Sequence, residues 1–209
     1  MKKRSIYIAI LFFLPGWIVA QHNSCNLAQS SYSSLYTVVP EDVRCIAKNS
    51  NKTVTIFYTF AAWCSPCLKH LPEAILLSKE QDADFYLLLM DRENYSDVKN
   101  AINAAKKKSP EENLKMVIIS DSLFSPKNRY KKEKIINIGS GIQEKYSNFV
   151  TAITPPQFEN IADMSKYIVL NKQGEVIFIS NYKDSENTKD KSKVIEKIVM
   201  VIEQNEGTR

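Results

Sequence analysis

The sequence predicts an α/β fold in which helices flank a central mixed sheet. Three apolar runs of strand length, at 53–60, 84–90 and 114–120, alternate with segments whose apolar residues have helical spacing. Such alternation indicates parallel strands that are joined by right-handed helical crossovers. Two further strands, at 166–170 and 175–180, are separated by a short polar turn that ends in glycine and predicts an antiparallel hairpin. The hairpin makes the predicted sheet mixed.

Length and charge limit the possible classes of protein. The chain has 209 residues, 44% of them hydrophobic, which is enough for one well-buried domain. The formal net charge is +5, and loss of the three basic residues at positions 2–4 with a cleaved leader would reduce it to +2. A nearly neutral chain gives no support for nucleic-acid binding. We expect a signal peptide at 1–20, an N-terminal extension at 21–39 and one folded domain at 40–209.

The first twenty residues have the pattern of a secretory signal. Lys2-Lys3-Arg4 precede an apolar run at 6–14, Pro15-Gly16 interrupt it, and Ala20 provides a small residue before the expected cut. The run is shorter than the roughly 20 residues of a membrane-spanning helix. We therefore expect an exported protein of the periplasm or cell envelope. An uncleaved N-terminal anchor is the alternative.

The first half of the predicted domain builds the central strand and the helix after it. Residues 21–39 are polar and indicate an extended lead-in, and a short helix is expected to begin at Pro40, where acidic residues suit its N-terminal end. The run at 53–60 is rich in β-branched and aromatic residues, as a buried strand should be. Residues 68–80 then show helical spacing of leucine and isoleucine.

The second half of the chain predicts the rest of the sheet and its covering helices. The continuous apolar run at 84–90 is typical of a strand covered on both faces. Ser96 is expected to cap a helix that ends at Ala105. The lysine-rich segment 126–146 predicts an irregular helical insertion before the last hairpin, and a final helix follows from Ser185 onwards.

Two cysteines separated by two residues lie where the strand at 53–60 turns into the helix at 68–80. The positive end of the helix dipole and its unpaired N–H groups favour a thiolate at Cys64, and the spacing allows Cys67 to close a disulfide within one turn. This pattern makes Cys64 the expected nucleophile and Cys67 the resolving thiol. A purely structural disulfide is the alternative. Zinc sites also use this spacing, but the strand–helix context already explains it, and we expect no metal.

The residues around the pair resemble a known family. The segment Trp63-Cys64-Ser65-Pro66-Cys67 resembles the Trp-Cys-x-Pro-Cys signature of the thioredoxin superfamily, and Pro72 matches the proline of its active-site helix. The longer segment 64–72 is most similar to the exported, TlpA-type thiol–disulfide oxidoreductase branch. The resemblance implies a thioredoxin-like fold and disulfide exchange without a cofactor. Trp63 is expected to shield the pair and line the docking surface, or else to be a core residue, and Pro66 to fix the backbone before Cys67.

Three positions depart from the pattern of the family. His70 stands where the TlpA-type branch often has a glutamate that handles the proton of the buried cysteine; an imidazole with a pKa of about 6.5 can take that proton, and a surface histidine is the alternative. Tyr58 stands where thioredoxins place a buried aspartate, and it cannot act as a carboxylate. Ser165 stands at the cis-proline position, so the preceding bond is expected to be trans. Pro155-Pro156 could instead serve through an insertion.

Export also affects how Cys25 and Cys45 are interpreted. In an oxidising compartment paired thiols tend to become disulfides. A Cys25–Cys45 bridge would tie the N-terminal extension to the domain and contribute about 3 kcal/mol for a loop of this size. Two free buried thiols, or a second redox pair that exchanges with Cys64–Cys67, are the alternatives.

The sequence thus predicts an exported thiol–disulfide oxidoreductase. We expect it to be a monomer that reduces disulfides of envelope proteins and is recharged by a membrane or envelope electron donor. A disulfide oxidase or isomerase would use the same residues and would differ in reduction potential. A thioredoxin-like binding or scaffold module without turnover is the alternative from another class.

Overall fold

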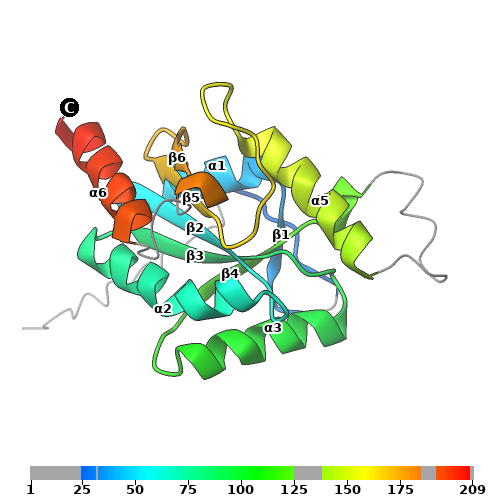
Figure 1. The fold of residues 1–209 in the computed structure, drawn as a ribbon. Coiled ribbons are helices and arrows are strands. Elements are labelled where there is room, and N and C mark those ends of the chain that lie inside the picture. The colour runs from blue at the N-terminus through cyan, green and yellow to red at the C-terminus, as the bar shows by residue number, and fades with distance from the viewer. Residues whose placement is uncertain (1–24, 32, 125–137, 185–191, 208–209) are drawn as a thin grey trace, which may run out of the picture.

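The structure is a computed structural model that describes residues 25–31, 33–124, 138–184 and 192–207, and Figure 1 shows its fold. Within these residues six strands form one sheet in the order β1-β4-β3-β2-β5-β6. Strands β1, β4, β3 and β2 run parallel to one another. Strand β5 runs antiparallel to both of its neighbours, β2 and β6. The sheet is therefore mixed, as predicted. Its strands are β1 (Tyr36–Val38), β2 (Val54–Phe60), β3 (Asp84–Leu89), β4 (Lys115–Ile119), β5 (Tyr167–Asn171) and β6 (Val176–Ile179).

Helices cover both faces of the sheet. They are α1 (Pro40–Asn49), α2 (Ser65–Glu80), α3 (Tyr95–Lys108), α5 (Ile138–Ile153) and α6 (Ser192–Gly207), with short 3₁₀ turns η1 (Asp121–Leu123) and η2 (Tyr182–Asp184). Helices α2 and α3 lie on one face, and α1 and α5 lie on the other (Figure 1). Right-handed crossovers explain this, because β2-α2-β3 and β3-α3-β4 step one way across the sheet and β1-α1-β2 steps the other way. The result is a thioredoxin-like α/β fold.

The centre of the sheet is the core of the molecule. All seven residues of β2 are buried, as are the last three of β3. A strand covered on both faces has no solvent side, which is why aliphatic and aromatic residues dominate both strands, although β2 also buries Thr55 and Thr59. Phe57 of β2 stacks on Tyr86 of β3 with ring centroids 5.1 Å apart. Strand β2 is therefore a rigid support for whatever follows its C-terminal end.

The N-terminal extension differs from the expected lead-in. Its last residues form β1, which pairs in parallel with β4 at the edge of the sheet. Val38 is fully buried, and the Thr37 N–H donates to the carbonyl of Ala28 over 2.8 Å. A strand of three residues is too short to show a period in sequence, so only its contact with β4 reveals it. The sheet thus begins before the expected boundary at residue 40.

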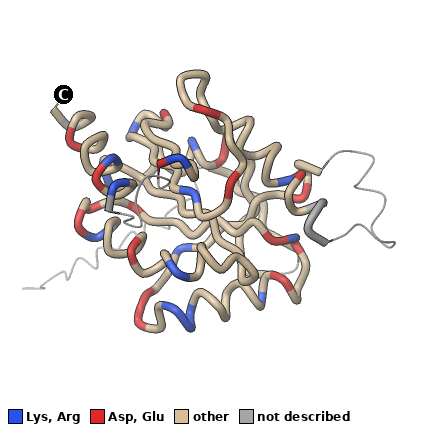
Figure 2. The backbone as a smooth tube through the Cα atoms, in the orientation of Figure 1, with Lys and Arg blue, Asp and Glu red and all other residues tan. Residues whose placement is uncertain are grey.

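Helix α3 is longer than predicted and has a different cap. The cap is Asn94, whose Oδ1 accepts from the Asp97 N–H over 2.9 Å, and Ser96 donates to the same oxygen over 2.8 Å. The helix continues past Ala105 through three exposed lysines at 106–108. Cations suit this end of a helix because of the dipole. Figure 2 shows these lysines in blue at the end of α3, and acidic and basic residues are interspersed along the rest of the described chain.

The insertion before the hairpin is more regular than predicted. Its described part is helix α5, which runs beyond the expected end at residue 146, and residues 125–137 lie outside the described residues. The predicted signal peptide at 1–20 and the expected start of the last helix at Ser185 also lie outside the described residues. In the parts of the chain that are described, the helices are too short or too polar to cross a membrane.

Candidate redox site

Cys64 and Cys67 lie at the junction that the sequence predicts, between the C-terminal end of β2 and the first turn of α2. Cys64 is the N-cap residue of α2, and its Sγ accepts a hydrogen bond from the Cys67 N–H over 3.2 Å. The two sulfurs are bonded in this structure. Pro66 lies in the first turn of the helix, where its missing N–H removes no intrahelical bond. The local structure thus directs the Cys67 N–H, in the first turn of α2, at the sulfur of Cys64.

Both sulfur-bearing residues are covered. Cys64 is 2% exposed and Cys67 is fully buried, so Cys64 is the more accessible of the two only by a small margin. In contrast, Trp63 is 48% exposed, and Pro66 is exposed as well. Trp63 is therefore not a core residue. The surface around the pair is formed by its exposed neighbours in the chain.

Trp63 is anchored by a residue that the sequence analysis did not single out. Its Nε1 donates to Oδ1 of Asp91 over 2.7 Å, and Asp91 is 2% exposed. Asp91 follows the C-terminal end of β3, and parallel strands bring their C-terminal ends to the same edge of a sheet. The position of this aspartate directly after a predicted strand, next to the strand that carries the cysteines, is the signal that could have identified it.

The carboxylate of Asp91 is in an unusual environment. Burial raises its pKa to about 6, which the hydrogen bond from Trp63 partly opposes; Asp97 of α3 raises it further, and Lys145 of α5 lowers it. Among the described residues no hydrogen-bond partner exists for Oδ2, although this oxygen is buried. Asp91 is therefore a buried acid that titrates close to neutral pH beside the redox pair.

Lys145 is fully buried at the same edge of the sheet. Its Nζ donates to the carbonyl oxygen of Asp91 over 2.5 Å, to that of Ile119 over 2.9 Å and to Oδ1 of Asp121 over 2.8 Å. Burial lowers its pKa, and Asp121 opposes that shift. One ammonium from α5 thus joins the ends of β3 and β4.

Tyr58 and Ser165 form a second set of contacts beneath the pair. The Tyr58 hydroxyl donates to the carbonyl oxygen of Cys67 over 3.2 Å, which leaves its oxygen to accept from the Ser165 hydroxyl over 2.6 Å. Burial raises the pKa of Tyr58, so the hydroxyl stays neutral. The two residues that depart from the family pattern at these positions are therefore bonded to each other and to the redox segment.

The loop at Ser165 has no cis peptide bond, and neither has any other described residue. Ser165 instead has a φ of +62°, in the left-handed region. Pro155-Pro156 follow α5 in a turn that is closed by the Phe158 N–H and the Pro155 carbonyl, 3.0 Å apart. The structure therefore places Ser165 near α2, to which Tyr58 links it, and the two prolines at the end of α5.

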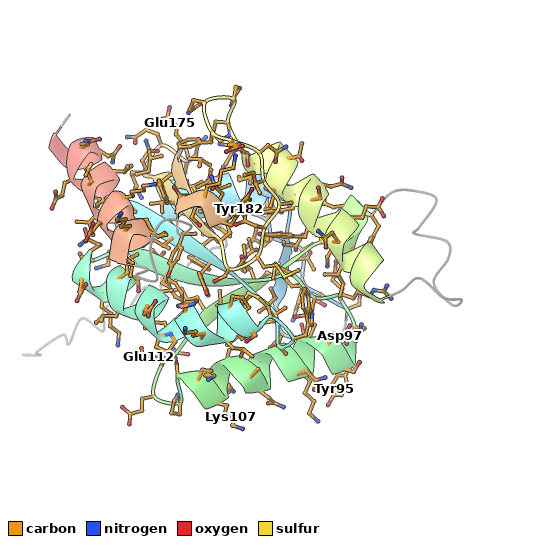
Figure 3. All side chains as sticks on the ribbon, in the orientation of Figure 1. Tyr95, Asp97, Lys107, Glu112, Glu175 and Tyr182 are labelled. Atoms are coloured by element: carbon orange, nitrogen blue, oxygen red, sulfur yellow. A yellow bond between two sulfur atoms is a disulfide. The ribbon has the colours of Figure 1, made fainter. Side chains whose placement is uncertain are left out.

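His70 is buried rather than on the surface. It is 5% exposed, and its Nδ1 lies 3.0 Å from Oε2 of Glu73, one turn further along α2. Both residues face a groove of about 450 Å³ between α2, the loop at Ser165 and the first turns of α6. Figure 3 labels Tyr182, which lies on η2 and also lines this groove. The rest of the lining consists of Pro66, Asp163, Met164, Ser165, Tyr167, Ser180, Asn181, Val194 and Ile195.

Cys25 and Cys45 are bonded to each other in the structure, with Cα atoms 5.7 Å apart. The bridge joins the segment before β1 to the middle of α1. Asn49 lies beside it, with Nδ2 donating to the carbonyl of Cys45 over 2.9 Å and 3.4–3.5 Å from the two sulfurs. No group of three or more metal-ligating side chains occurs among the described residues. The expectation of no metal and no cofactor stays a prediction.

No protein-family model and no curated protein matches this chain. Solved structures with some similarity include a protein described as a disulfide isomerase in Bacteroides thetaiotaomicron (15% identity, 72% of this chain and 74% of that one, TM-score 0.39). A thio-disulfide isomerase from Thermus thermophilus (12%, 74% and 82%, 0.39) and yeast Sco1 (11%, 76% and 88%, 0.39) are two more. Overlap and identity at this level do not show an activity for this chain.

Proposed function

We propose that this protein is an exported thiol–disulfide oxidoreductase that uses Cys64 and Cys67 to reduce disulfides of envelope proteins. The observation that carries the proposal is the N-cap position of Cys64. Its sulfur already accepts the N–H of Cys67 and faces the positive end of a helix of 16 residues. Both effects stabilise a thiolate and therefore lower the pKa of the thiol in the reduced protein. A structural disulfide gains nothing from this position.

The reaction divides between the two sulfurs. The Cys64 thiolate attacks one sulfur of a substrate disulfide, which forms a mixed disulfide and releases the other substrate sulfur as a thiolate that takes up a proton. Cys67 then loses its proton and attacks Sγ of Cys64, which closes the Cys64–Cys67 bond and releases the second substrate sulfur. The substrate gains two electrons and two protons. An electron donor of the envelope or membrane, itself a thiol carrier, returns them to the pair.

His70 is the proposed acceptor for the proton of Cys67. It lies three residues after Cys67 on the same side of α2, is almost fully buried, and is held by Glu73. An imidazole accepts a proton at neutral pH, which a buried tyrosine at position 58 does not do. The resemblance of residues 64–72 to the TlpA-type branch, with histidine in place of glutamate, supports this assignment of role.

Export is part of the same proposal. It is supported by the signal-like pattern at residues 1–20 and by the pairing of Cys25 with Cys45, since disulfides persist in oxidising compartments. We assign the protein to the periplasm or cell envelope, with exported proteins as substrates and a monomer as the working form. Fractionation of cells that express the full chain tests this part separately from the chemistry.

The chemistry is tested by trapping the intermediate. Full-length Cys67→Ser protein, incubated with a disulfide-bonded peptide, is expected to form a stable mixed disulfide through Cys64 that a mass spectrum identifies. Cys64→Ser protein is the matched control and should form none. If Cys67→Ser protein forms no adduct while its folded state is intact by circular dichroism, the proposed activity is wrong.

A binding module without turnover is the second candidate. The observations in its favour are the near-complete burial of Cys64 and a serine at the cis-proline position. Such a module would not speed the reduction of a disulfide-bonded peptide by dithiothreitol above the rate without protein. A rate that rises with the protein concentration would exclude it.

A further inference from the structure

We propose that Asp91 is a positioning residue of the redox pair, which fixes the indole of Trp63 next to Cys64 and is itself held in place by Lys145. The effect on the redox chemistry rests on the proposed function. The contacts that hold Asp91 and Trp63 do not rest on it, because they come from the ends of β3 and β4 and from α5 rather than from the helix that carries the cysteines.

The first step is the anchoring of an exposed indole. Trp63 is 48% exposed, and a side chain with so few neighbours loses rotamer freedom only if something holds it. Its one polar atom donates to a carboxylate that is 2% exposed, over 2.7 Å. A hydrogen bond to a charged acceptor is about twice as strong as a neutral one. The residue directly before Cys64 is therefore fixed from the neighbouring strand.

The second step is the anchoring of Asp91 itself. The ammonium of Lys145 has three donor hydrogens, and the structure provides three acceptors for them, at Asp91, Ile119 and Asp121. Two of these are main-chain carbonyls at the ends of β3 and β4. A fully buried ammonium without such partners would be strongly destabilising. Lys145 thus holds the backbone that places the Asp91 carboxylate.

The third step is the charge on Asp91. Its Oδ2 is buried, with no partner among the described residues, so the ionised form is only half satisfied. Facing groups are Asp97 from α3, which Figure 3 labels, and Lys145 from α5. Burial is the largest effect and raises the pKa of Asp91 to about 6. Asp91 therefore changes charge within the range in which an envelope protein works.

Two further acids belong to the same cluster around the ammonium. The Asp121 N–H donates to the Glu93 carboxylate over 2.5 Å, and the Glu93 N–H reaches Asp121 over 3.3 Å. Burial lowers the pKa of Lys145, and Asp121 and Glu93 oppose that shift. The ammonium therefore lies among three acids, Asp91, Glu93 and Asp121.

The consequence for the redox pair follows from charge. An ionised Asp91, bonded to the residue before Cys64, disfavours a second negative charge on that sulfur. Above pH 6 the pair is therefore shifted toward the disulfide, which makes the reduced protein a stronger reductant. Below pH 6 a neutral Asp91 removes this effect.

The experiment follows Trp63 directly. The chain has two tryptophans, so full-length Trp17→Phe protein leaves Trp63 alone. In the oxidised form its fluorescence should change with a midpoint near pH 6. Asp91→Asn, which keeps an acceptor oxygen but cannot titrate, should abolish the change, and Lys145→Met should move the midpoint to higher pH. His70→Gln, which removes a second ionisable side chain of the site, is the control and should leave the transition in place.

The thiol of Cys64 gives the second readout. In Cys67→Ser protein, Asp91→Asn should raise the alkylation rate of Cys64 by iodoacetamide at pH 7, on the order of threefold to tenfold. A fluorescence transition that survives in Asp91→Asn, or an alkylation rate that does not change, would overturn the proposal. The fluorescence measurement needs no turnover. If the transition depends on Asp91 but Cys67→Ser protein forms no mixed disulfide, the proposed function is wrong and the positioning role of Asp91 stands.

Discussion

The two disulfides of this protein place the same bond in two different settings. Cys64 and Cys67 are three residues apart, at the N-terminal end of α2 and almost fully buried. Cys25 and Cys45 are twenty residues apart, join the N-terminal segment to the middle of α1, and are partly exposed. The pair that we propose to be reactive is therefore the less exposed of the two.

On the proposed function, location in a helix rather than exposure separates the two roles. The backbone N–H groups in the middle of α1 are used within the helix, so a thiolate at Cys45 would receive none of them. At Cys64 the first N–H groups of α2 are free to stabilise a negative sulfur. The Cys25–Cys45 bond closes the longer loop, so it restricts the unfolded chain more strongly than the Cys64–Cys67 bond does.

The largest expected effect distinguishes the pairs by activity. Cys64→Ser should lower the rate of disulfide reduction at least about 10³-fold, because the nucleophile is lost. The double variant Cys25→Ser/Cys45→Ser should retain most of the rate in the same insulin-reduction assay. Equal losses in both variants would show that the two pairs act together in the exchange reaction.

The next expected effect distinguishes them by stability. Cys25→Ser/Cys45→Ser should lower the free energy of unfolding by about 3 kcal/mol, and Cys64→Ser/Cys67→Ser by about 2 kcal/mol, from the lengths of the two loops. Urea unfolding of both variants and of the oxidised parent measures this. A larger loss in the Cys64/Cys67 variant would contradict the assignment of the structural role to Cys25–Cys45.

Asp91 should make stability depend on pH at the reactive edge. Its pKa is raised from 3.8 to about 6, so the folded state binds this proton more tightly than the unfolded state does. The resulting stabilisation is present below pH 4 and is lost as the pH rises through 6, by up to about 3 kcal/mol. Asp91→Asn should therefore gain stability relative to the parent between pH 4 and 7. A difference that stays constant over this range in urea unfolding would contradict the shift.

The smallest effect concerns the contacts beneath the reactive pair. Tyr58→Phe removes the hydroxyl that bonds Ser165 and the Cys67 carbonyl, and it should cost about 1–2 kcal/mol of stability. Because burial keeps this tyrosine neutral, the pH profile of Cys64 alkylation should not move. A changed profile would show that Tyr58 takes part in proton transfer. Ser165→Ala is the matched variant and should cost a similar amount.

The sequence predicted most of the sheet and the position of Cys64 and Cys67 between β2 and α2, because both depend on local patterns. Strand β2 and the second half of β3 are buried, and apolar side chains dominate such strands in the sequence. The cysteine spacing and the helical spacing after it place the pair at the N-terminal end of α2. Strand β1 was missed, since three residues show no period, and Asn94 was missed as the cap of α3 because Ser96 is an equally good capping residue type.

The remaining parts of the site depend on contacts between distant residues. Asp91 and Trp63 are 28 positions apart, Lys145 and Asp91 are 54 apart, and Tyr58 and Ser165 are 107 apart. Lysine-rich segments usually face solvent, so nothing in the pattern around Lys145 indicated a buried ammonium. Only the packing of α5 against the ends of β3 and β4 reveals it.

The most direct test of the central claim is the reduction potential of the Cys64–Cys67 pair in the full chain. It is measured by equilibration with glutathione and dithiothreitol buffers, with the Cys25→Ser/Cys45→Ser variant to isolate the signal. We expect a value near that of thioredoxin, about −270 mV. A value near −120 mV would make the protein an oxidant and contradict the reductase direction. A pair that does not exchange with either buffer while the protein stays folded would contradict the redox function itself.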